Sequence, residues 1–113
     1  MRKMLITGMA LLVAGTLWGE SLEERIKKGK EIAWNRSKGN CLACHMMDNG
    51  DLPGNTAPPL MMMSQRYPSK AALRAQIWDP TVKNPNTFMP PFGKHKILSD
   101  QEVDLVTDYV FSL

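Results

Sequence analysis

The sequence predicts an all-α domain in which three helices flank long irregular segments. Apolar residues recur at helical spacing in three stretches, at residues 21–36, at residues 69–78 and from residue 99 onward. No stretch has the alternating pattern of a β-strand. All eight prolines fall between Pro53 and Pro91 and outside the three stretches. Such long irregular segments are uncommon in a compact domain, so we expect them to pack around something other than side chains.

Serine residues mark the starts of the three predicted helices. Ser21 and Ser99 are each followed three residues later by glutamate, which is the spacing of a capping box, and Ser69 can cap the middle helix. Gly29 lies inside the first helix, where glycine costs about 1 kcal/mol relative to alanine. We therefore expect the last helix to cross closely at Gly29, with Tyr109 placed against it.

The most specific feature of the chain is C-L-A-C-H at residues 41–45. Two cysteines three apart, followed directly by a histidine, form the pattern for covalent attachment of c-type haem. On one helical turn Cys41 and Cys44 share a face, so both sulfurs can form thioethers to one porphyrin. His45 can then reach the iron as the proximal ligand. We predict one covalently bound haem c, around which the irregular segments wrap.

Two other uses of this motif agree less well with the sequence. A disulfide or redox pair leaves His45 unexplained, and no thioredoxin-like pattern of strand and helix surrounds it. A closed zinc site needs four ligands, and the only other histidine is His95. Both cysteines of the chain lie in the motif, so none remains as an active-site thiol.

Residues 1–19 are predicted to be a cleaved signal peptide, and residues 20–113 one cytochrome c domain. Arg2 and Lys3 precede an apolar run at residues 5–14. The run is shorter than the roughly 20 residues of a membrane span, so a retained anchor is the lesser alternative and we expect a periplasmic protein with no stable membrane anchor. Removing Arg2 and Lys3 from the 14 basic residues leaves a charge of +1 against the 11 acidic ones, which argues against a nucleic-acid binder.

The sixth iron ligand is predicted to be Met89. The remaining candidates are one histidine and five other methionines of the mature chain: His95, Met46, Met47, Met61, Met62 and Met63. Two prolines stiffen the backbone after Met89, and the flanking Phe88 and Phe92 can exclude water from its sulfur. His95 lies between two lysines, as in a solvated loop. As alternatives, Met89 fills the core, or the methionines bind copper(I).

The proximal side of the haem is predicted to include Pro58 and Leu60. A histidine on iron normally donates its other ring N–H to an acceptor, and the Pro58 carbonyl is our candidate. Leu60 can press on the porphyrin face. The predicted haem-binding residues are therefore Cys41, Cys44, His45, Pro58, Leu60 and Met89, with His45 and Met89 on the metal.

Three segments together carry a resemblance to a known family. They are G-N-C-L-A-C-H at residues 39–45, L-P-G-N-T-A-P-P-L at residues 52–60, and M-P-P-F-G-K at residues 89–94 followed by I-L-S. They resemble SoxX, the monohaem cytochrome c subunit of SoxAX complexes in periplasmic sulfur oxidation. The resemblance implies a class I cytochrome c fold and the same haem ligands. Ala57 departs from the usual glycine of the family, and the chain lacks the longer amino-terminal extension of some members.

The resemblance also implies a function and a set of partners. A SoxA-type dihaem or monohaem subunit carries the catalytic haem of the complex, which oxidatively couples thiosulfate to a cysteine of the carrier SoxYZ. The SoxX-like subunit is non-catalytic and passes electrons to a downstream cytochrome. Two alternatives stay open: a freestanding soluble cytochrome c that shuttles electrons to a terminal oxidase or peroxidase, and a periplasmic copper-binding protein.

Overall fold

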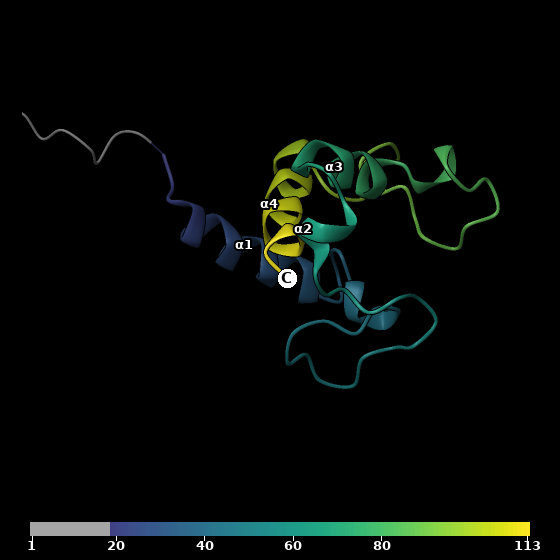
Figure 1. The fold of residues 1–113 in the computed structure, drawn as a ribbon, viewed down its shortest axis with the longest axis horizontal. Helices are drawn as coiled ribbons and strands as arrows, with labels where there is room; N and C mark the ends of the chain where they lie inside the picture. Colours follow the sequence, from purple (N-terminus) through teal and green to yellow (C-terminus); the bar gives the residue numbers. More distant parts are fainter. Residues whose placement is uncertain (1–18) are drawn as a thin grey trace, which may run out of the picture.

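The computed structural model describes residues 19–113 of the chain, and these residues form a helical domain (Figure 1). Its elements are, in order, α1 (Leu22–Trp34), η1 (Cys41–Ala43), α2 (Met63–Arg66), α3 (Lys70–Trp78), η2 (Pro80–Val82) and α4 (Asp100–Phe111). The β-type pairing within residues 19–113 is one isolated bridge between Met47 and Leu60. The all-α prediction is confirmed. The predicted signal peptide lies, apart from Gly19, outside the described residues and stays a prediction.

The three long helices begin at the predicted serines. Ser99 accepts a hydrogen bond from the Glu102 backbone N–H, and the Glu102 carboxylate accepts one from the Ser99 backbone N–H, both at 3.1 Å. Ser21 accepts from the Glu24 backbone N–H at 3.2 Å, but the return bond of a capping box is not made there. The prediction of a full box at Ser21 is therefore wrong, and α1 also ends at Trp34, two residues earlier than expected.

Gly29 is the point where α1 and α4 cross, as the glycine in the first helix indicated (Figure 1). A Cβ atom at Gly29 would collide with the backbone carbonyl oxygen of Leu105 and lie 2.9 Å from Cβ of Tyr109. Only glycine lets the two helix backbones approach this closely. At this crossing, one face of α4 is turned toward the cavity described below.

A core of buried side chains fills the space between α1, α3 and α4. Its members come mainly from the three long helices and the loops next to them: Ala33, Met47, Met63, Leu73, Ile77, Phe92, Leu98, Val103, Val106, Tyr109 and Val110. Trp34 packs against this core and donates its indole N–H to the Tyr109 hydroxyl at 3.1 Å. Burial raises the pKa of Tyr109 to about 12, so its hydroxyl stays protonated at neutral pH.

Ion pairs also join the three long helices. Asp108 of α4 lies 2.7 Å from Arg25 of α1 and 2.9 Å from Lys70 of α3. Burial raises the pKa of the Asp108 carboxyl, but the hydrogen bonds from Lys70 and Arg25 outweigh it, so the pKa lies below its ordinary value. One carboxylate thus connects all three long helices.

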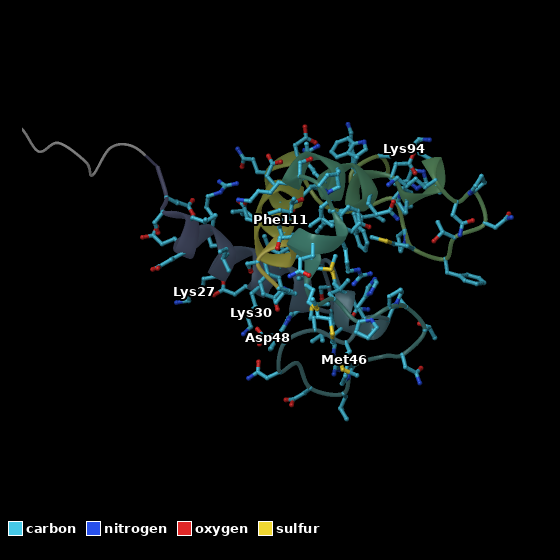
Figure 2. All side chains as sticks on the ribbon, viewed as in Figure 1. Lys27, Lys30, Met46, Asp48, Lys94 and Phe111 are labelled. Carbon is cyan, nitrogen blue, oxygen red and sulfur yellow. The ribbon has the colours of Figure 1, made fainter. Side chains whose placement is uncertain are left out.

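A further ion pair fixes the loop after residue 45 to α1. Lys30 of α1 lies 3.2 Å from Asp48 of that loop, and Figure 2 shows the two side chains together. The same Lys30 ammonium lies 4.4 Å from the centre of the Trp34 ring.

Among residues 19–113, no helix has the length and apolar character needed to cross a bilayer.

Candidate haem site

A cavity of about 1060 Å³ lies between the helices α3 and α4 and the two irregular segments. All six predicted haem-binding residues line it: Cys41, Cys44, His45, Pro58, Leu60 and Met89. Apolar side chains of the core form its wall, among them Leu73 of α3 and Val106 and Val110 of α4. The volume is at the upper end for small-molecule sites, about 300–1,000 Å³, and so suits a large rigid ligand.

The C-L-A-C-H segment forms a tight turn at one edge of the cavity. Asn40 enters the turn in the left-handed conformation with φ 50°, and the His45 N–H donates to the Cys41 carbonyl at 2.9 Å. Cys41 and Cys44 are not joined to each other, and Cys44 is exposed. Burial raises the pKa of the free Cys41 thiol to about 11, so before a thioether forms this sulfur is protonated at neutral pH.

The loop containing Pro58 lies against this turn and fixes the His45 ring. Nδ1 of His45 is 2.6 Å from the Pro58 carbonyl oxygen, which is the hydrogen bond that the sequence led us to expect. With Nδ1 donating to Pro58, Nε2 is the ring nitrogen left to bind a metal. The Ala57 N–H donates to the Cys44 carbonyl at 3.0 Å, and the Leu60 N–H donates to the Met46 carbonyl at 2.8 Å.

Gly54 allows the same loop to pass directly over the motif turn. Its N–H donates to the Leu42 carbonyl at 2.7 Å, and a Cβ atom at this position would collide with the Ala43 carbonyl oxygen. Backbone hydrogen bonds therefore fix the His45 side of the cavity at several points along the loop.

Met89 lines the cavity from the second irregular segment, residues 79–98. The Met89 N–H donates to the Thr87 hydroxyl at 3.1 Å, and the Thr87 N–H donates to the Asn84 carbonyl, also at 3.1 Å. For residues 85–90, the hydrogen bonds found in the described structure all stay within the segment 84–89. Compared with the His45 side, this side of the cavity is thus fixed mainly by its own local turns.

Of the two phenylalanines expected to shield Met89, only Phe92 is buried, with 8% of its surface exposed. Phe88 is fully exposed at 102%, so that part of the prediction is wrong. The segment turns between them, and Phe88 points outward from the rim of the cavity.

Comparison with known sequences and structures agrees with a cytochrome c. Residues 21–110 match the sequence family described as cytochrome c oxidase, cbb3-type, subunit III. The chain belongs to this family. It therefore is an electron-transfer cytochrome c domain, and haem c is its cofactor. The match favours the haem interpretation of the methionines and cysteines over the copper(I) one.

A solved structure extends the comparison to the whole domain. The cytochrome c domain is similar to a chain in the crystal structure of SoxXA from P. pantotrophus, with a TM-score of 0.68 and 26% sequence identity. The similarity covers 76% of this chain and 79% of the solved one. The SoxX-like character expected from the three sequence segments is confirmed. A comparison with curated proteins gave no significant match.

Of the remaining ligand candidates of the cytochrome, only Met63 lines the cavity. His95 is exposed and does not line it, and Met61 and Met62 are exposed at 53% and 57% without lining it either. Met63 does line the cavity, but it is a buried member of the core. Met89 is therefore the methionine that reaches the cavity from the side of residues 79–98.

The cavity lining also fits the chemistry of a haem beyond the predicted residues. Three cationic side chains line it, Arg36, Lys38 and Arg66, which suit the two carboxylates of a porphyrin. Sequence reasoning missed these residues, because isolated basic residues in loops carry no motif. The signal available for Arg66 was its position three residues after Met63, next to the Pro58 loop.

Proposed function

We propose that this cytochrome c is the electron-transfer subunit of a SoxAX-type complex in the periplasm. One observation carries the proposal: a single cavity brings together Cys41, Cys44, His45 and Met89 in a chain that is similar to a SoxXA structure. A SoxA-type subunit is the partner. Export by the predicted signal peptide brings the chain to the compartment where such a complex works.

Haem c supplies one-electron chemistry at its iron when bound. In the proposed site Cys41 and Cys44 would attach a single haem through thioethers, and His45 and Met89 would bind its iron. His45 presents Nε2, since its Nδ1 faces the Pro58 carbonyl. Leu60 and Phe92 exclude water from the two faces.

The thiosulfate chemistry takes place on the partner rather than on this chain. Both cysteines are used for haem attachment and no other cysteine exists, so the chain has no thiol nucleophile to accept a sulfur group. The SoxA-type subunit couples thiosulfate to a cysteine of SoxYZ, and this subunit passes the released electrons to a downstream cytochrome.

Exposed apolar side chains at the rim of the cavity support a stable partner. Phe88 and Ile97 line the cavity and are exposed at 102% and 45%. Exposed apolar side chains beside a functional site are candidates for contact with a partner. To test the proposal, the protein is purified from its native periplasm and co-purifying chains are identified. A SoxA-like cytochrome is expected; purification alone, or with an oxidase, would reject it.

A second candidate is a freestanding electron shuttle to a terminal oxidase, and the description of the matched family, a subunit of a cbb3-type oxidase, supports the link to an oxidase. Both functions need the same iron ligands, so the site does not separate them. Reduction assays with the purified protein and either membranes containing an oxidase or a SoxA-type subunit with thiosulfate would decide which donor and acceptor it serves.

The ligand set is tested by replacing Met89 with alanine. The variant should keep its covalent haem but lose the thioether-to-iron absorption, and its reduction potential should fall by on the order of 100 mV, within the roughly 0.8 V range that axial ligands span. Met61→Ala is the matched control, because Met61 is exposed and does not line the cavity. An unchanged potential in Met89→Ala would mean that another residue binds the iron.

A further inference from the structure

Arg66 makes two contacts that join the Pro58 loop to the cavity wall. Its Nη1 donates to the Pro59 carbonyl oxygen at 2.8 Å and lies 3.3 Å from the Met63 sulfur. Met63 and Arg66 begin and end the short helix α2, so the i, i+3 spacing places them on one face. Both residues line the cavity, Met63 as a buried side chain and Arg66 as an exposed one.

Apart from His45 Nδ1 at the Pro58 carbonyl, Arg66 is the donor that holds the middle of the Pro58 loop in the described structure. The loop is bound at its ends, where Ala57 donates to the Cys44 carbonyl and Leu60 donates to the Met46 carbonyl. Pro58 and Pro59, between these ends, have no backbone N–H. Within the described structure, Arg66 is the donor recorded at the Pro59 carbonyl.

The Pro59 carbonyl and the Pro58 carbonyl are mechanically coupled. The φ angle of a proline is fixed near −65°, so ψ of Pro59 is the one soft backbone angle between the two carbonyl groups. Fixing the Pro59 oxygen therefore also limits the directions in which the Pro58 oxygen can point. The Pro58 oxygen is the acceptor 2.6 Å from His45 Nδ1.

We propose that Arg66 is a positioning residue for the proximal histidine: its hydrogen bond to the Pro59 carbonyl holds the Pro58 carbonyl on His45 Nδ1 and so sets the electron donation of His45 to iron. The inference rests on the proposed ligation of iron by His45. A stronger hydrogen bond at Nδ1 gives the imidazole more anionic character, which stabilises the oxidised iron and lowers the reduction potential.

The positioning role and a simple charge effect predict opposite changes in the reduction potential when Arg66 is replaced. Loss of a positive charge at the cavity stabilises the oxidised, more positive iron and lowers the potential. Loss of the Arg66 hydrogen bond to Pro59 instead weakens the hydrogen bond between the Pro58 carbonyl and His45 Nδ1, and this raises the reduction potential. Arg36 is the matched comparison, because it lines the same cavity and has no recorded contact with the Pro58 loop.

The experiment measures hydrogen exchange of the His45 Nδ1–H by NMR in the reduced holoprotein, for wild type, Arg66→Met, Arg66→Lys and Arg36→Met. In Arg66→Met the exchange should become faster by about tenfold, the factor expected from loss of one hydrogen bond. Arg66→Lys keeps a donor and a charge and should restore slow exchange, while Arg36→Met should exchange like wild type. The potential of Arg66→Met should also lie above that of Arg36→Met.

Exchange in Arg66→Met as slow as in wild type would overturn the proposal, whichever way the potential moves, and would leave Arg66 as a surface charge. If Arg66 only stabilised the fold, Arg66→Met would lower the unfolding temperature but would leave exchange of the His45 Nδ1–H unchanged at temperatures below unfolding. The wild-type spectrum separately tests the ligation on which the inference rests. A His45 ring proton without the large porphyrin ring-current shift would reject His45 as ligand, independently of the Arg66 variants.

Discussion

The helices and the loops of this domain are held together in different ways. The helical part, α1, α3 and α4, is joined by buried side chains, by the close crossing at Gly29 and by the ion pairs of Asp108. The loop part, residues 46–62 and 79–98, is held by backbone hydrogen bonds and encloses the cavity. The helical part has a core of its own but also lines the cavity through Leu73, Val106 and Val110, whereas the loop part needs the cofactor as its inner surface.

The largest expected effect comes from removing the cofactor's attachment. Loss of the haem would leave about 1060 Å³ of the interior without its apolar ligand, in a domain whose stability is typically only about 5–15 kcal/mol. Cys41→Ala/Cys44→Ala should therefore yield a largely unfolded, colourless product. Far-UV circular dichroism and hydrogen exchange measure this. Full helical content with cooperative unfolding would show that the helical part is stable alone.

The next effect tests the helical part itself. Gly29→Ala should lower the free energy of unfolding by about 2 kcal/mol, because overpacking costs about 1–3 kcal/mol and exceeds the gain in helix propensity. Gly50→Ala is the control, since a Cβ atom at Gly50 would meet only the end of the flexible Leu42 side chain. If denaturant titrations showed equal losses of unfolding free energy in the two variants, the close helix crossing would not be the reason why residue 29 must be glycine.

A smaller effect is expected at the ion pairs. Asp108→Asn should lose about 1–2 kcal/mol at neutral pH, because its carboxylate accepts charge-assisted hydrogen bonds from Arg25 and Lys70. The pKa of Asp108 is lowered in the fold, so its contribution is present above the ordinary value of about 3.9 and is lost as the pH falls below it. Urea titrations at pH 7 and pH 3 should show the difference from wild type shrinking in acid. A difference that persisted in acid would contradict the assigned cause.

The smallest effect distinguishes the two helix starts. Ser99→Ala should destabilise by about 1 kcal/mol and Ser21→Ala by roughly 0.5 kcal/mol, because Ser99 takes part in a reciprocal capping box and Ser21 makes one bond. Thermal unfolding of both variants measures the order. The reverse order would indicate that the start of α1 carries more of the stability than its hydrogen bonds suggest.

The sequence predicted the features that depend on local pattern. Capping serines and apolar spacing gave the starts of α1, α3 and α4, and Gly29 indicated the helix crossing, because these effects act within a few residues. The acceptor at Pro58 followed from the need of a ligating histidine for a partner. The ligand roles of His45 and Met89 remain predictions.

Features set by distant contacts could not be predicted. Arg25 and Asp108 pair across 83 positions of sequence, and either residue alone reads as an ordinary surface charge. Helix α2 has four residues, too few for a periodic pattern, so the role of Arg66 was hidden. The outward direction of Phe88 depends on how its loop turns around the cavity, which composition does not determine.

Residues 85–90 make hydrogen bonds only within the segment 84–89 in the described structure, so the Met89 side of the cavity is held less firmly than the His45 side. If His45 and Met89 bind the haem iron as proposed, we expect mild heating to release the Met89 sulfur before the His45 nitrogen, so that a small molecule such as cyanide could bind in place of the sulfur. A warming series in which imidazole departs before thioether would contradict this order. Substitutions in residues 84–89 could therefore change how firmly the Met89 side holds the haem, while the turn at residues 41–45 stays unchanged.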